Sequence, residues 1–350
     1  MRSVYDRLDA NASAHTQIIE SQESFQKAVN ELKTSKQDIS LAIGGGGAYG
    51  EASYRIALKL LSEGIHPTEY VGNSAGAIIA TLLALGYEDP QYVEHFLSGL
   101  DKNIKFKDIP LALITKLIPF VYEFPEEYKL LQTRLFQEND AFFGHIKSKS
   151  LSEFFINGEL STHAIEKVIC DFFGMTKQDI SLHKITFNDV KRGGFGRKKT
   201  GEGVGLRILA GAITDIDTAI KRGVRRHTKE NNGIMRAIQF RGTYPVFDAI
   251  FASACPGFPK KTNIKGGTFR VTDGYMAGQN FPSYSQYFTE KNTRVLIHTD
   301  DDFFLTKLVL PDYGDMDYVF RPDMRGGDAF GTSPEARTRV QDATMKIIGA

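Results

Sequence analysis

The chain has 350 residues and a net charge of +1, and it is 41% hydrophobic and 24% charged. These values suit one large α/β domain, alone or with additions, and they lack the charge excess that would favour nucleic acid as a partner. Two cysteines exclude a disulfide framework, and no metal-binding spacing of cysteine or histidine occurs, so we expect no metal and no cofactor.

The N-terminal region is polar and lacks the apolar stretch of a conventional signal peptide. No run of 18 apolar residues occurs, so we expect no membrane-spanning helix and a chain that is cytoplasmic as made. Residues 1–38 are predicted to form an N-terminal helical extension with one amphipathic helix, marked by Phe25, Val29 and Leu32.

Two strand-to-helix units follow. The first has a strand over 39–43, four glycines and a helix over 52–62. The second has a strand over 67–71 and a helix over 75–85. Strands that alternate with helices predict an α/β fold around a central, mostly parallel sheet.

The second unit turns through G-N-S-A-G, residues 72–76. A serine on a sharp turn between strand and helix projects its hydroxyl outward, so Ser74 is a candidate nucleophile. The alternative is a small residue at a tight packing point.

The first unit turns through G-G-G-G-A-Y-G, residues 44–50. Unhindered N–H groups of Gly45, Gly46 and Gly47 at a helix N-terminus can hold a developing oxyanion. The spacing of Gly45, Gly47 and Gly50 also matches the G-x-G-x-x-G fingerprint of dinucleotide-binding proteins. That motif requires an acidic residue near the end of the second strand. Residues 72–74 stand there instead, so we reject the dinucleotide interpretation.

The middle of the chain, residues 100–200, is predicted to be a cap or insert region. Residues 104–124 are apolar, interrupted by two prolines and flanked by lysines. They suit a buried cap helix or a helix that dips into a lipid interface. An amphipathic helix is predicted over 161–173. The glycine-rich, basic loop over 191–203 is either a solvated hairpin tip or a weak headgroup site formed by Arg197, Lys198 and Lys199.

Further elements are predicted as a strand over 206–212, a helix over 245–254, and strands over 268–271 and 294–297. A serine nucleophile needs a base. His298, at the end of the last of these strands, makes a Ser74–Asp273–His298 triad formally possible.

The chain resembles the patatin-like phospholipases, serine acyl hydrolases that use a Ser–Asp dyad. The resemblance rests on five motifs in the right order: the glycine loop 45–50, G-x-S-x-G at 72–76, T-D-I-D-T at 214–218, A-S-A-C-P-G-F-P at 252–259, and D-G-Y at 273–275 followed by N-F-P at 280–282. Tyr49 departs from the Arg or Lys that is usual in the glycine loop, and Tyr275 departs from the small residue that is usual after Asp-Gly.

The resemblance implies a three-layer α/β/α fold with the nucleophile elbow after the second core strand. It implies a catalytic domain over 39–310, with residues 311–350 as a C-terminal extension. It also implies a Ser74–Asp273 dyad, with Asp215 and Asp217 as rival carboxylates, acting on phospholipid at a membrane surface without metal.

The family includes bacterial cytotoxins that are delivered into host cells, and the four glycines and the basic insert are similar to that branch. Peripheral membrane association and a protein activator are further expectations. The alternatives are a lipid-binding pseudoenzyme in which Tyr275 blocks turnover, and a Ser–His–Asp esterase that uses His298.

Overall fold

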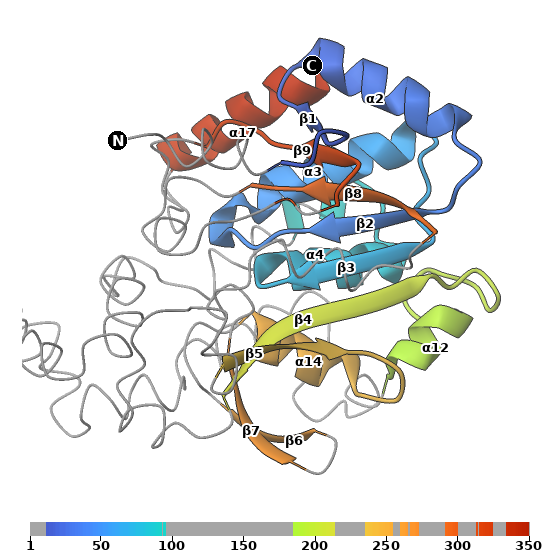
Figure 1. Cartoon of the computed structure of the whole chain (residues 1–350), viewed down its shortest axis with the longest axis vertical. Helices are drawn as coiled ribbons and strands as arrows, with labels where there is room; N and C mark the ends of the chain where they lie inside the picture. Colours follow the sequence, from blue (N-terminus) through green and yellow to red (C-terminus); the bar gives the residue numbers. More distant parts are fainter. Residues whose placement is uncertain are drawn as a thin grey trace, which may run out of the picture.

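The strands of the protein form a single mixed sheet in a computed structural model, which describes residues 12–92, 94–95, 185–213, 235–254, 260–264, 267–272, 291–299, 313, 315–324 and 334–349. Within these ranges nine strands pair in the order β1-β9-β8-β2-β3-β4-β7-β6, and β5 also pairs with β4 (Figure 1). The strands are β1 (Gln17–Ile19), β2 (Ile39–Ile43), β3 (Glu69–Asn73), β4 (Gly205–Ile213), β5 (Met235–Phe240), β6 (Lys260–Ile264), β7 (Gly267–Thr272), β8 (Thr293–Ile297) and β9 (Tyr318–Phe320).

The sheet is parallel from β1 to β4 and antiparallel beyond it, where β4 pairs with β5 and β7, and β7 pairs with β6. The predicted α/β class with a mostly parallel sheet is confirmed. The strands expected over 39–43, 206–212, 268–271 and 294–297 are present as β2, β4, β7 and β8. The strand expected over 67–71 lies two residues later, so β3 runs directly into Ser74.

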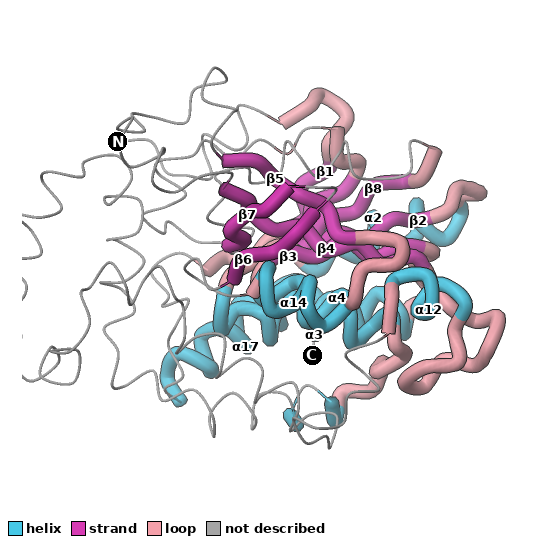
Figure 2. Tube along the Cα trace, turned by 90° about the horizontal axis from the view of Figure 1, so that it is seen from below, coloured by secondary structure: helices cyan, strands magenta, loops and turns pink. Residues whose placement is uncertain are grey.

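The helices gather on one face of the sheet, where α3, α4, α14 and α17 lie side by side (Figure 2). Their bounds are α2 (Gln22–Thr34), α3 (Gly50–Ser62), α4 (Ala75–Ala84), α12 (Phe187–Arg192), α14 (Val246–Ser253) and α17 (Pro334–Ile348), and a short 3₁₀ turn, η1 (Gly47–Tyr49), precedes α3. Every residue of α4 after Ala75 is buried, as expected for a helix that is apolar all round.

Alternation along the strands separates two cores. Leu41 and Ile43 of β2 belong to the large core that the sheet shares with the helices. Ala42, between them, belongs to a smaller cluster with Tyr313 and Met316 on the opposite face. Successive strand residues point to opposite faces, so this pattern follows directly from the pleat.

The segments before residue 39 and after residue 310 contribute to the same sheet and helical layer. β1 extends the sheet edge by pairing with β9. The predicted helix around Phe25, Val29 and Leu32 is present as α2, begins with a capping box at Ser21, and buries those three side chains. α17 packs on both α2 and α3.

Two predicted elements, the apolar stretch 104–124 and the helix 161–173, lie outside the described residues. Within the described ranges, no helix combines the length and the apolar character that crossing a bilayer requires.

Candidate active site

Ser74 lies at the carboxyl end of β3 in a conformation that non-glycine residues seldom adopt. Its φ is 51° and its ψ is −132°, and it is the one non-glycine residue of the described chain with a positive φ. Such a conformation costs about 1–3 kcal/mol and persists only where the surroundings impose it. The side chain is half-buried, and α4 begins at the next residue.

The two glycines of G-N-S-A-G are required by close backbone approach. A Cβ on Gly72 would lie 2.4 Å from the carbonyl oxygen of Gly76, and a Cβ on Gly76 would lie 2.1 Å from that of Ile43. No side chain fits at either distance. The glycines therefore allow the first turn of α4 to pack against the ends of β2 and β3.

Ser253, at the end of α14, holds the backbone of the turn from outside. The N–H of Ser74 donates to Ser253 Oγ at 2.9 Å, and this hydroxyl donates to the carbonyl of Leu209 in β4 at 2.5 Å. Ser253 is fully buried. Ser253 is part of the A-S-A-C-P-G-F-P motif. Its role in the site could not be predicted from the sequence, because its partner Ser74 lies 179 residues away.

The glycine loop passes directly beside Ser74. A Cβ on Gly45 would lie 2.8 Å from Ser74 Cβ and 3.5 Å from its Oγ. Gly46 and Gly47 have positive φ angles of 154° and 56°. The N–H of Gly44 is bonded to the carbonyl of Ile297.

The next three N–H groups of this loop are the candidate donors. None of the backbone hydrogen bonds found among the described residues uses the N–H of Gly45, Gly46 or Gly47 as donor. Three backbone donors thus lie at the start of η1 and α3, where a helix favours negative charge. Asn73 adds a buried acceptor, since its Oδ1 lies 3.3 Å from the position of a Gly45 Cβ and has no hydrogen-bond partner among the described residues.

His298 follows β8 and is fully buried. Its ring packs edge-on against Tyr313, with 5.6 Å between ring centroids, in the core on the sheet face opposite the helices. Burial, helped by the nearby Arg321 charge, lowers the pKa of His298 to about 3. Its imidazole is therefore neutral at pH 7 and weakly basic, which suits a general base poorly.

The carboxylates predicted as catalytic or rival bases, Asp273, Asp215 and Asp217, lie outside the described residues, as does Tyr275. The described strand β7 ends at Thr272, one residue before Asp273.

The basic loop lies at the far end of α4 from Ser74. The N–H of Arg197 bonds to the carbonyl of Leu85, the residue that follows the last turn of this helix. The Arg197 guanidinium stacks over Tyr92, at 4.9 Å from the ring centroid, and Lys198 pairs with Glu88 at 2.6 Å. Lys199 is exposed. Ten helical residues span about 15 Å, so the structure does not bring these cations together with Ser74.

Among solved structures, the chain is similar to VipD from Legionella pneumophila, with a TM-score of 0.46 and 15% identity over 90% of this chain and 67% of VipD. It is also similar to the type III effector protein ExoU, with a TM-score of 0.35 and 18% identity over 89% of this chain and 52% of that one. A structure of the ExoU–SpcU complex from the type III secretion system of Pseudomonas aeruginosa matches with a TM-score of 0.37 and 19% identity, over 89% of this chain and 51% of that one. The chain thus spans about half the length of the ExoU chains it matches.

No curated protein matches the sequence significantly. A family model does match it, described as patatin-like phospholipase, over residues 41–284, which is more than half of the chain. This range contains the glycine loop, the Ser74 turn and Ser253. The chain belongs to the patatin-like phospholipase family.

Proposed function

We propose that this lipid acyl hydrolase is a phospholipase of the A type that uses Ser74 as nucleophile, Asp273 as base and the N–H groups of Gly45–Gly47 as oxyanion hole. The single observation that carries the proposal is the arrangement of Ser74. Its strained backbone lies against a glycine loop whose three N–H groups have no acceptor among the described residues. Preorganised donors beside a nucleophile are the main requirement for acyl transfer.

The register of the sheet supports Asp273 as the base. Arg270, Val271 and Thr272 of β7 pair with Ile213, Ala212 and Gly211 of β4 in turn. The strand thus approaches the level of Leu209, which pairs with Asn73 on the other side of β4. Thr272 lies two strand spacings, about 10 Å, across the sheet from β3. Asp273 therefore follows a strand that ends close to Ser74.

The chemistry begins when Ser74 Oγ attacks the carbonyl carbon of a fatty-acyl ester and its proton passes to the Asp273 carboxylate. The tetrahedral oxyanion lies against the glycine loop. Collapse breaks the ester bond, and Asp273 returns the proton to the departing alcohol oxygen, leaving an acyl group on Ser74. Water, deprotonated by Asp273, then releases the fatty acid and restores the serine.

Two hydrogen bonds favour the glycine loop over the nucleophile's own amide as the oxyanion site. Ser253 already accepts the N–H of Ser74, and Ile297 accepts that of Gly44. Loss of one oxyanion donor typically lowers the rate by about 10²–10³. The low pKa of His298, about 3, favours the dyad over the triad that would use this histidine.

The substrate is a phospholipid at a membrane surface, with the protein associated peripherally. This follows from family membership and from the chemistry of an ester held in a bilayer. Headgroup binding by Arg197, Lys198 and Lys199 stays a prediction from the charge of their loop. A protein activator and delivery into a host cell stay predictions from the resemblance.

The test is fatty-acid release from mixed phospholipid vesicles by the wild type and by Ser74→Ala, with labelling by a fluorophosphonate probe measured in parallel. We expect release and labelling by the wild type and neither by the variant. Labelling without release would indicate that an activator or another lipid is required. A folded wild type that neither labels nor releases fatty acid would contradict the proposal and favour the pseudoenzyme alternative.

A further inference from the structure

Tyr49 is the first large side chain after the four glycines, and it is buried. It closes the loop: its N–H donates to the carbonyl of Gly46 at 3.0 Å, and α3 begins at the following residue. Only 1% of its surface is exposed. The position of Tyr49 therefore affects Gly46, whose carbonyl accepts this hydrogen bond.

The C-terminal helix buries Tyr49. A separate apolar cluster consists of Tyr49 and Ala52, of Met324, and of Val340 and Ala343 from α17. α17 lies beyond residues 41–284, the part of the chain that the family model matches. A helix outside the matched range thus covers the residue that follows the glycine loop.

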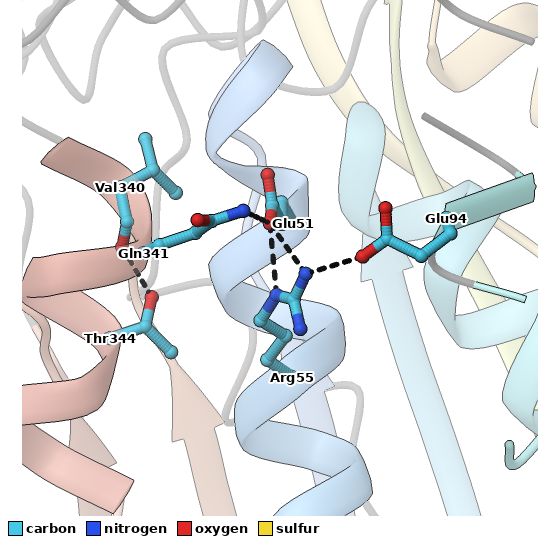
Figure 3. A network of polar contacts seen from close by, with 6 residues as sticks. All are labelled: Glu51, Arg55, Glu94, Val340, Gln341 and Thr344. Atoms are coloured by element: carbon cyan, nitrogen blue, oxygen red, sulfur yellow. Dashed lines mark hydrogen bonds and ion pairs between the residues drawn. The ribbon is translucent and has the colours of Figure 1, made fainter. Parts of the chain in front are cut away.

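A polar contact joins the same two helices beside this cluster (Figure 3). Glu51, in the first turn of α3, is almost fully buried. Its Oε1 accepts hydrogen bonds from Arg55 Nε and from Gln341 Nε2 of α17, each at 2.9 Å. Arg55 also pairs with Glu94 at 2.8 Å. The helix dipole of α3 stabilises the Glu51 carboxylate at the helix N-terminus. The hydrogen bond from Gln341 ties the same carboxylate to α17.

The glycine loop needs such support from outside. Four consecutive glycines have more backbone freedom than any other four residues. An oxyanion hole is effective only if its hydrogen-bond donors are fixed before the reaction. Gly46 and Gly47 have positive φ angles, and neither carries a side chain that could anchor the loop. Tyr49 and Glu51 are the first two large side chains after these glycines in sequence, and both contact α17.

We propose that α17 is a positioning element for the oxyanion loop, acting through Tyr49 and Glu51. This inference rests on the proposed function, because it assigns the loop a role in hydrolysis. The residues concerned touch no substrate. They hold the N–H groups of Gly45–Gly47 in the geometry that the oxyanion needs.

The test compares two truncations within the same helix of the full chain. Val340→Ala removes packing beside Tyr49, whereas Ile347→Ala removes packing two turns away, in the main core. We expect Val340→Ala to lower kcat on phospholipid vesicles by about fivefold to tenfold with KM within twofold. Ile347→Ala should lower thermal stability at least as much and keep kcat within twofold.

Three further variants keep the test decisive if Val340→Ala folds poorly. Gln341→Ala alters a surface side chain and should lower kcat by about threefold. Tyr49→Phe keeps the buried ring and should retain most of the activity, whereas Tyr49→Ala should lose at least tenfold. Equal kcat losses in Val340→Ala and Ile347→Ala, or no loss in either, would overturn the inference.

Amide hydrogen exchange of Gly44 and Tyr49, whose N–H groups donate to the carbonyls of Ile297 and Gly46, separates this inference from the proposed function, because exchange does not require activity. We expect exchange to accelerate at least fivefold in Val340→Ala and to be unchanged in Ile347→Ala. If the exchange rates change in this way but the wild type has no hydrolase activity, α17 positions the loop and the proposed function is wrong. Hydrolysis by the wild type with unchanged loop exchange in Val340→Ala would refute the positioning role alone.

Discussion

The N–H of Ser74 donates a hydrogen bond to Ser253 Oγ, and the same hydroxyl donates to the carbonyl of Leu209. One buried hydroxyl thus connects the strained turn after β3 to the neighbouring strand β4. The bond also commits the N–H of the nucleophile, so that this group is not available to an oxyanion.

Replacing Ser253 by alanine should slow catalysis more than it weakens binding. The variant leaves the part-buried Ser74 N–H without its acceptor, at a cost of about 1–3 kcal/mol. We expect kcat to fall by about tenfold to 100-fold with KM within twofold, measured by fatty-acid release. Thr81→Ala is the control, since Thr81 is buried in α4 and its hydroxyl, within the described part of the chain, bonds only to the carbonyl of Ala77. A similar kcat loss in both variants would mean that Ser253 acts through stability alone.

Gly45→Ala should abolish most activity while the protein still folds. The new Cβ would lie 2.8 Å from Ser74 Cβ, so the loop or the serine must move. We expect kcat to fall by about 10²-fold or more, as for loss of an oxyanion donor. Gly64→Ala is the matched control: its φ is 82°, and apart from its neighbours in the chain no atom of the described residues lies within 4 Å of the added methyl group. It should cost about 1–2 kcal/mol of stability and leave kcat unchanged.

His298 should make the protein sensitive to acid without contributing to turnover. Its pKa is lowered to about 3 in the folded chain, from a usual value near 6.5. Between these values the unfolded chain binds a proton at His298 and the folded chain does not. Stability therefore falls as pH decreases from about 6.5 to about 3, by up to about 1.4 kcal/mol per pH unit.

The check on this effect is denaturant unfolding of the wild type and His298→Gln at several pH values. The variant should show the shallower loss of stability on acidification, with kcat at pH 7 close to that of the wild type. An identical acid profile in the two proteins would contradict the burial of a neutral imidazole.

Neutralising the basic loop should leave the chemical step intact. Arg197, Lys198 and Lys199 lie at the end of α4 that is remote from Ser74. We expect Arg197→Gln with Lys199→Gln to keep kcat on a water-soluble ester within twofold. Lys198→Gln breaks the pair with Glu88 and should cost about 1 kcal/mol or less. A large loss of kcat on the soluble ester would show that the loop reaches the site.

Much of the fold was predictable because the central elements have strong local signals. β2 is a continuous buried run, and α4 is apolar throughout. Glycines mark both turns at the carboxyl ends of β2 and β3. The predicted end of β3 was two residues early, because Gly72 and Asn73 resemble a turn in sequence but still pair with β4.

The remaining elements depend on contacts between distant parts of the chain. β1 and β9 are three residues each and pair across about 300 positions of sequence, so neither has a recognisable local pattern. Ser253 is a site residue only through its bond to Ser74. The helical spacing of Val340, Ala343 and Ile347 was available as a signal for α17, but its packing against Tyr49 was not.

The most direct measurement of the central claim is kcat for fatty-acid release by the wild type, Asp273→Asn, Asp215→Asn, Asp217→Asn and His298→Gln, each checked for folding. The proposed dyad predicts that Asp273→Asn alone loses at least about 10³-fold, since it retains the shape of the side chain and loses the base. Full activity of folded Asp273→Asn, or loss of activity in His298→Gln instead, would contradict the dyad.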